Sequence, residues 1–199
     1  MIDFARYNFH PVIKLPKDYE VYDFTRRYDP SRQPRTPYGV GRYNEDRRGM
    51  YDAALFQSEQ GPRTIHMGID IGTPVGEPVH AFYEGEIFLA GYNAAKGDYG
   101  HTLITRHVLG GEDLYALHGH LSERSTRESQ PGRRFHAGEV IAWVGDRHEN
   151  GGWNPHLHFQ LSLIRPEKCD LPGVVTPDQR AQALARYPDP RLVLGPLYP

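Results

Sequence analysis

Three short clusters of histidine and aspartate follow one another along this chain of 199 residues. The clusters are His66-Met-Gly-Ile-Asp70, His118-Gly-His120 and His156-Leu-His158. Imidazole nitrogens and carboxylate oxygens bind zinc, and a hydrolytic zinc site takes three protein ligands and leaves the fourth position to water. The clusters therefore predict a hydrolase with a single zinc ion.

The spacing inside the clusters predicts local structure. Alternate residues of a strand share one face, so His156 and His158 would point the same way, about 6.6 Å apart. One of them could bind a metal while the other serves the chemistry beside it. In a straight strand His66 and Asp70 would lie about 13 Å apart, too far for one metal. The chain must therefore bend between them, and Gly68 is the expected place.

The segments around the clusters predict a mainly β fold, a curved antiparallel sheet or sandwich. Short runs of alternating polarity are separated by Gly-rich or polar turns, which is typical of such folds. The expected strands cover residues 78–91, 100–108, 113–121, 139–145 and 156–164. Further on, Thr176 as N-cap and Pro177 in the first turn predict a short C-terminal helix.

With their flanking residues, the clusters resemble the lysostaphin-like (LytM-type) zinc metallopeptidase family. The similar stretches are His66-Met-Gly-Ile-Asp70 followed by Ile-Gly-Thr-Pro, Leu117-His-Gly-His-Leu-Ser122 and Pro155-His-Leu-His-Phe-Gln160. The resemblance covers about residues 64–165. It implies an antiparallel β fold with a long open groove, like the duplicated hybrid motif.

The same resemblance implies an activity and its residues. The cofactor would be Zn²⁺, with His66, Asp70 and His158 as metal ligands. His120 and His156 would be the catalytic residues beside the water that the zinc activates. The protein would be an endopeptidase, and its substrate a peptide such as a stem or bridge peptide of peptidoglycan.

The mechanism expected from these residues has no glutamate base, because the sequence contains no His-Glu-x-x-His motif. His120 and His156 must then orient the water, stabilise the oxyanion and protonate the leaving amine. The sequence leaves open which histidine does which.

Three positions depart from the family pattern. His118 stands where relatives commonly carry Tyr, and by strand alternation it would share a face with His120 as an extra cleft residue. Gln160 replaces the usual Glu, so the support of a metal ligand is what this change would weaken, not metal binding itself. His101 stands where a small polar residue is expected, and its role is open.

The composition limits the partners. With 23 basic and 25 acidic residues the net charge is −2, so no overall field favours nucleic acid or an anionic membrane. No apolar stretch predicts a membrane span, and the first residues do not form a signal peptide. As written, the chain is expected in the cytoplasm; if a leader was removed, the periplasm or the cell exterior is expected. Nothing in the sequence indicates an oligomeric state.

The chain divides into three parts. Residues 1–62 carry many Tyr, Arg, Asp and Pro residues with little apolar periodicity, which predicts a strap packed on the core. Residues 63–165 form the expected catalytic domain, and residues 166–199 form a tail with the short helix. Side chains of the strap are expected to line one side of the groove or to cover it. The candidates nearest the first cluster are Tyr43, Arg47, Arg48 and Tyr51.

Two alternatives to an enzyme stay open. The first is a non-catalytic zinc-binding scaffold of the same fold, against which the presence of all five expected residues argues. The second is a phosphotransfer carrier that uses two histidines in a cleft. Such a carrier needs no metal and has no use for Asp70.

Overall fold

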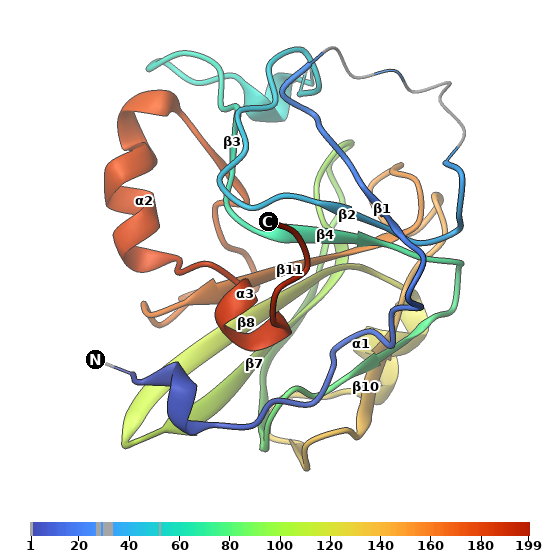
Figure 1. Cartoon of the computed structure of the whole chain (residues 1–199), viewed down its shortest axis with the longest axis vertical. Helices are drawn as coiled ribbons and strands as arrows, with labels where there is room; N and C mark the ends of the chain where they lie inside the picture. The colour runs from blue at the N-terminus through green and yellow to red at the C-terminus, as the bar shows by residue number, and fades with distance from the viewer. Residues whose placement is uncertain (1, 27–28, 30–33, 52) are drawn as a thin grey trace.

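The computed structural model describes residues 2–26, 29, 34–51 and 53–199. The chain is mainly β, as predicted (Figure 1). The strands are β1 Glu20–Val21, β2 Gly39–Gly41, β3 Ile65–His66, β4 Ile69–Gly72, β5 Pro78–His80, β6 Gly85–Asn93, β7 Gly100–Leu109, β8 Glu112–Leu121, β9 Arg134–Phe135, β10 Val140–Trp143, β11 His156–Ser162 and β12 Val174–Val175. The α-helices are α1 Glu123–Glu128, α2 Arg180–Arg186 and α3 Arg191–Leu194, and the 3-10 helices are η1 Phe4–Arg6, η2 Ala54–Phe56 and η3 Pro177–Gln179.

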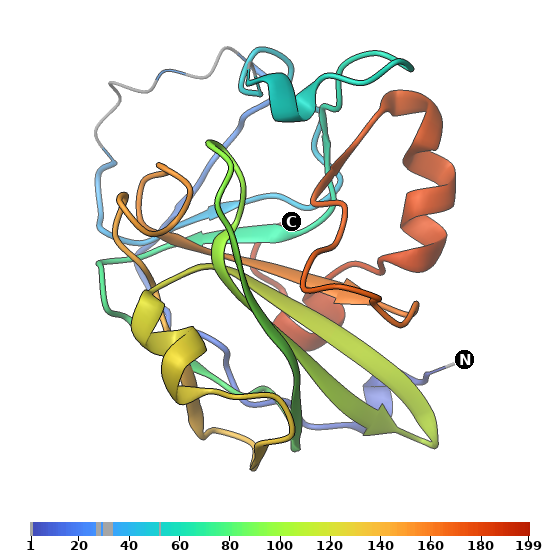
Figure 2. The ribbon, with the colours of Figure 1, turned by 180° about the vertical axis from the view of Figure 1, so that it is seen from behind.

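One eight-stranded sheet organises the described residues, in the order β1-β2-β4-β11-β8-β7-β6-β9. Its neighbouring strands are antiparallel, apart from the parallel pair of β1 and β2. Figure 1 shows β2, β4, β11, β8 and β7 following one another down the molecule. Seen from behind, the sheet is strongly twisted (Figure 2). Two small sheets pair β5 with β10 and β3 with β12.

The alternation along β11 separates the core from the candidate site. Its apolar residues Leu157, Phe159 and Leu161 are fully buried in the main hydrophobic cluster, together with residues of β4, β8 and the small β5–β10 sheet. The polar residues of the same strand therefore point to the opposite face, as the sequence predicted.

The predicted strap contributes to this core and to the sheet. Strands β1 and β2 extend the large sheet beyond β4, and Val12, Ile13 and Val40 are buried in the main cluster. Residues 1, 27–28, 30–33 and 52 of the predicted strap lie outside the described residues. In the part that is described, the strap is a structural component of the sheet and not only a surface layer.

One expected strand is wrong in its extent. The segment 78–91 forms two strands, since β5 pairs with β10 and β6 pairs with β7. The residues between them carry the chain from the small sheet to the large one, and Phe82 among them is fully buried. Alternating polarity detects burial but not a change of partner strand, so the two strands appeared as one.

The other expected elements are confirmed, with small shifts at their ends. The C-terminal helix begins as the 3-10 turn η3 after Thr176 and continues as α2, and Gln179 Oε1 accepts the Thr176 N–H at 3.3 Å. The sequence did not predict the helices α1 and α3 or the strands β1, β2, β3, β4, β9 and β12. Among the described residues, no helix has the length and apolar content needed to cross a membrane.

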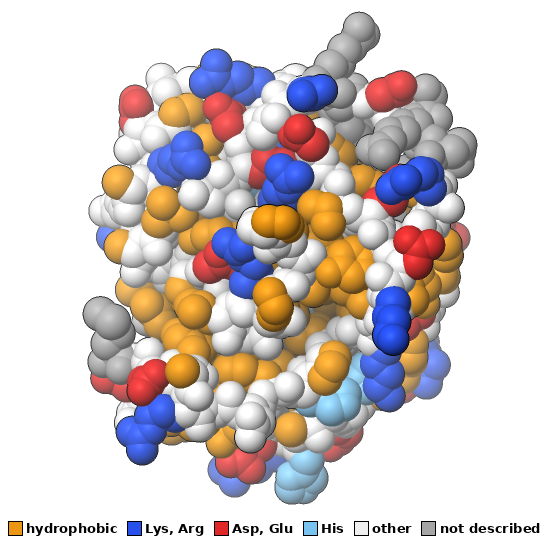
Figure 3. Space-filling view, viewed as in Figure 1, with side chains coloured by type: hydrophobic (Ala, Val, Ile, Leu, Met, Phe, Trp, Pro, Cys, Tyr) orange, Lys and Arg blue, Asp and Glu red, His pale blue; other side chains and the backbone are white. Residues whose placement is uncertain are grey.

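The surface charge is mixed. On the face shown in Figure 3, most of the described Lys and Arg side chains lie among Asp and Glu. This arrangement fits the net charge of −2.

Strand alternation placed His118 and His120 on one face, and this prediction is wrong. His118 is paired with Phe159 and packs against its ring in the core, with the centroids 5.3 Å apart. His120 has a φ of +63°, in the left-handed region, and this turn interrupts the alternation at the end of β8. His118 therefore belongs to the core, and only His120 reaches the cleft.

The predicted bend between His66 and Asp70 is confirmed, because β3 ends at His66 and β4 begins at Ile69. A Cβ atom on Gly68 would lie 2.5 Å from His158 Nε2 and 2.9 Å from the Phe159 carbonyl oxygen. Gly68 is therefore needed for the close approach of the bend to β11.

We expect Gly68→Ala to lower the free energy of unfolding by about 1–3 kcal/mol, since the added methyl group must displace backbone or the His158 ring. Gly72→Ala is the matched control on β4, because its Cβ would meet no atom closer than 3.6 Å. Urea unfolding followed by circular dichroism measures both variants. Equal stability of the two would show that the bend has room for a side chain.

A second prediction concerns acid stability. Burial, together with the charge of neighbouring His107, lowers the pKa of His118 to about 3. The unfolded state therefore binds a proton that the folded state does not, and stability decreases as the pH falls below about 6.5. His118 contributes up to about 1.4 kcal/mol per pH unit to the loss of unfolding free energy between pH 6 and 4. We expect His118→Leu to abolish this contribution.

Denaturant titrations of the metal-free protein at several pH values measure this slope. The control is His148→Leu, whose side chain is 78% exposed and stays in water in both states. An unchanged slope in His118→Leu would contradict the assignment of His118 to the core.

Candidate active site

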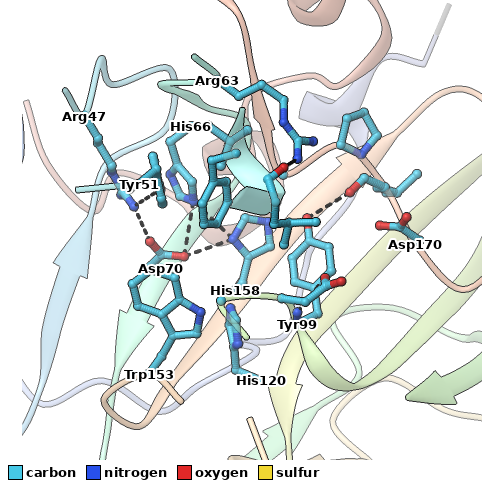
Figure 4. A pocket seen from close by; sticks show the side chains of 18 of the residues that line it. Arg47, Tyr51, Arg63, His66, Asp70, Tyr99, His120, Trp153, His158 and Asp170 are labelled. Carbon is cyan, nitrogen blue, oxygen red and sulfur yellow. Dashed lines mark hydrogen bonds and ion pairs between the residues drawn. The ribbon is translucent and has the colours of Figure 1, made fainter. Parts of the chain in front are cut away.

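The pairing of the strands brings three of the predicted residues together. His158 on β11 stands opposite Asp70 on β4, and the bend at Gly68 returns His66 to the same point. His66 Nε2 lies 3.1 Å from His158 Nδ1 and 3.2 Å from Asp70 Oδ1, and His158 Nδ1 lies 3.0 Å from Asp70 Oδ1. Figure 4 shows these side chains converging. We call these three atoms the donor triangle.

The hydrogen bonds on the outer sides of the two rings fix their tautomers. His66 Nδ1 donates to the Arg42 carbonyl oxygen at 2.9 Å, and His158 Nε2 donates to Gln160 Oε1 at 3.1 Å. The nitrogens that face each other in the donor triangle therefore carry lone pairs and no proton. Two imidazole nitrogens and one carboxylate oxygen in such proximity fit a bound zinc ion, whose ligand atoms are separated by about 3.3 Å.

Gln160 has a different part from the one expected. The sequence predicted that having Gln160 in place of the usual Glu would weaken the support of a metal ligand. This prediction is wrong, because Gln160 keeps a hydrogen bond to the ligand His158. Its amide oxygen accepts the His158 proton, and its amide nitrogen donates to the Pro172 carbonyl oxygen at 3.4 Å. The fully buried amide keeps the acceptor that orients the ring, without the negative charge.

The charge of Asp70 is balanced from two sides. Its Oδ2 atom accepts from Arg47 Nη1 at 2.6 Å, while Oδ1 faces the two histidines (Figure 4). Burial alone would raise the pKa of Asp70, but the His66 and His158 imidazoles at Oδ1 and the Arg47 charge at Oδ2 hold it well below its ordinary value. Burial and the Arg47 charge lower the pKa of His66 to about 4. Near neutral pH, His66 is therefore neutral and Asp70 ionised, the forms that bind metals.

The two predicted catalytic histidines lie next to the donor triangle. The ring centroids of His120 and His156 are 4.2 Å apart, and His156 Nε2 lies 3.8 Å from Asp70 Oδ1. His120 Nδ1 donates to the Asn150 carbonyl oxygen at 2.8 Å, and His156 Nδ1 donates to that of Asn154 at 2.6 Å. Each ring therefore keeps an unprotonated Nε2. Burial lowers the pKa of both histidines, which keeps them neutral near pH 7.

Two hollows meet at this site. A cavity of about 370 Å³ is lined by all five predicted site residues, and a second one of about 460 Å³ shares Asp70 and His156 with it. Met50 and Trp153 line both cavities. Residues 97–99, just before β7, line the first cavity, whereas no described residue of 122–135 lines either cavity.

The strap reaches the site through part of the expected set. Arg47 and Tyr51 line the first cavity. Tyr43 lies elsewhere and donates to the Tyr187 carbonyl oxygen at 2.6 Å, and Arg48 is exposed and pairs with Asp46. His101 also lies outside the site, where its Nδ1 contacts Thr126 Oγ1 at 2.8 Å.

Sequence reasoning missed several lining residues. Tyr99 packs against the rings of both His120 and His158, and its hydroxyl donates to the Leu171 carbonyl oxygen at 3.0 Å. Arg63, whose guanidinium contacts the Leu55 carbonyl oxygen, also lines the first cavity, as do residues 171–174 of the tail. No motif marks these positions, because they reach the site only through the path of the folded chain.

Curated relatives match the central part of the chain. The DD-carboxypeptidase/endopeptidase Mpg of Neisseria meningitidis serogroup B is 38% identical over 112 residues, and that of Neisseria gonorrhoeae is 37% identical over the same length. The match covers 54% of this chain and 23% of each relative, so the chain corresponds to about a quarter of their length.

Solved structures give weaker likenesses. The catalytic domain of lysostaphin from Staphylococcus simulans is 22% identical with a TM-score of 0.44, covering 66% of this chain and 80% of that one. A single-residue variant of the catalytic domain of the prophage-encoded M23 protein EnpA from Enterococcus faecalis is 21% identical with a TM-score of 0.46, covering 76% and 94%. A zinc-containing peptidase from Vibrio cholerae is 24% identical with a TM-score of 0.41, covering 53% and 29%.

A family profile covers the strands that carry all five predicted residues. The profile described as Peptidase family M23 matches residues 64–169, more than half of the chain. Because this match includes β3, β4, β8 and β11 in one continuous segment, the chain belongs to peptidase family M23, as the LytM-type motifs predicted.

Proposed function

We propose that this protein is a zinc-dependent endopeptidase in which His66, Asp70 and His158 bind the metal. The observation that carries the proposal is the donor triangle, whose edges measure 3.0–3.2 Å and whose two nitrogens carry lone pairs. When bound, zinc acts as a Lewis acid that polarises a peptide carbonyl and lowers the pKa of water toward about 7.

His120 and His156 are the proposed acid–base pair. In the neutral form each Nε2 only accepts a hydrogen bond, so the pair can hold the attacking water and remove its proton. Once it has taken the proton, an Nε2 becomes a donor that can stabilise the oxyanion and protonate the leaving amine. The carbonyl oxygens of Asn150 and Asn154, in the loop before β11, accept the Nδ1 protons and so orient both rings.

The proposed substrate is a peptide of peptidoglycan, either a stem or a bridge peptide. The names of the Neisseria relatives, DD-carboxypeptidase/endopeptidase, support this class, as does membership of family M23. The two cavities that meet at Asp70 and His156 also favour a chain-like substrate that extends to both sides of the reacting bond.

The test combines metal analysis with turnover. The purified protein is analysed for zinc and incubated with isolated peptidoglycan and with soluble cross-linked peptides, and the products are identified by mass spectrometry. We expect about one zinc per chain, cleavage of a peptide bond, loss of cleavage with a chelator, and recovery on adding zinc. Zinc binding without any cleavage would favour the scaffold alternative, and absence of metal binding would favour the phosphotransfer carrier.

A ligand variant provides the next prediction. Asp70→Ala removes the only carboxylate of the donor triangle, so we expect it to lose most of its zinc as measured by elemental analysis. Asp98→Asn is the control, because Asp98 lines the same cavity outside the triangle. Stoichiometric zinc in Asp70→Ala would exclude Asp70 from the ligand set.

The two catalytic assignments are tested separately from the ligands. We expect His120→Ala and His156→Ala to keep their zinc and their fold but to lower kcat by about 10² to 10⁴. His101→Ala, which changes a histidine outside the site, should leave both zinc content and kcat unchanged. If a folded His120 or His156 variant lost its zinc, that histidine would move to the ligand set.

A further inference from the structure

We propose that Arg47 is a positioning residue that lets only one oxygen of Asp70 face the metal. Arg47 lies before the segment that matches family M23, so the family match does not include it. This inference rests on the zinc site proposed above. Its basis is the geometry of a buried guanidinium group that contacts a proposed ligand from behind.

The two oxygens of the Asp70 carboxylate have separate partners. Oδ1 forms one corner of the donor triangle, whereas Oδ2 lies 2.6 Å from Arg47 Nη1. A carboxylate that is free to rotate can bind a metal through one oxygen or through both. A charge-assisted hydrogen bond to Oδ2 removes that freedom, since turning Oδ2 toward the metal would break the short contact to Nη1 of a buried guanidinium group.

Arg47 is itself held on every side. Its Nε donates to Glu45 Oε2 at 2.9 Å, its Nη1 also donates to the Tyr51 hydroxyl at 3.0 Å, and its Nη2 donates to the Arg42 carbonyl oxygen at 3.3 Å. The guanidinium carbon lies 4.9 Å from the centre of the Phe24 ring, and the side chain is 1% exposed. A side chain fixed in this way can transmit a fixed orientation to Asp70.

The same strap segment also orients a second ligand. The Arg42 carbonyl oxygen that accepts from Arg47 also accepts the His66 Nδ1 proton, at 2.9 Å. The Glu45 carbonyl oxygen accepts the backbone N–H of His66 at 3.0 Å. Residues 42–51 of the strap therefore support two of the three proposed ligands from outside the family segment.

The test measures metal binding and coordination in Arg47→Met, with Arg48→Met as the matched control because Arg48 is exposed and pairs only with Asp46 among the ion pairs described. Zinc affinity is measured by competition with a chromophoric chelator. We expect Arg47→Met to bind zinc about 10- to 100-fold more weakly, the usual effect of losing a partner of a metal ligand. Arg48→Met should stay within about threefold of the wild type.

A spectroscopic measurement separates positioning from a general loss of stability. Cobalt(II) replaces zinc, and its visible absorption is intense with four ligand atoms and weak with five or six. We expect Arg47→Met to show weaker absorption at saturating cobalt, as Asp70 Oδ2 becomes free to bind. Thermal unfolding of the metal-free variants reports the structural effect alone.

A second variant guards against misfolding, because Arg47→Met leaves Glu45 without its buried partner. The double change Glu45→Gln with Arg47→Met removes both charges, and the same loss of affinity and the same spectral change are expected from it. Unchanged or tighter zinc binding with an unchanged cobalt spectrum in the folded double variant would overturn the role of Arg47. Failure of the wild type to bind either metal would instead overturn the proposed function.

Discussion

The buried charge of Asp70 is the constraint on which the site depends. Its side chain is 15% exposed, and a carboxylate this far from water is stable only where cations or hydrogen-bond donors surround it. Arg47 supplies one such group on Oδ2, and Oδ1 faces the imidazoles and the proposed metal position. Segments of β3, β4, β11 and the strap meet at this group and supply its partners.

The orientation of four histidines is a second common theme. Each ring donates a proton to an acceptor outside the site: the carbonyl oxygens of Arg42, Asn150 and Asn154, and the side chain of Gln160. The remaining nitrogen of each ring therefore carries a lone pair. Because three of these acceptors are backbone groups, the shape of the loops fixes the protonation pattern as firmly as the side chains do.

The strap has a structural part and a part at the site. Its strands β1 and β2 lengthen the large sheet, and its Val40 lies in the main core. Tyr51 and Phe56 of the strap pack with their ring centroids 4.6 Å apart, beside the cavity. The Tyr51 ring also lies 6.3 Å, between centroids, from that of Trp153 in the loop before β11. A segment that shares both the core and the cavity wall links the stability of the fold to the shape of the groove.

The sequence by itself determined the histidine and aspartate clusters, the bend at Gly68 and the polar face of β11, because these depend on residue type and on a strand period of two. It could not determine that His118 faces the core, since the left-handed backbone at His120 interrupts that period. The division of 78–91 into two strands likewise depends on which strands become neighbours. Only the tertiary structure brought Arg47 to Asp70 and Gln160 to His158, since the chain distance between two residues does not predict a contact set by the packing of other segments.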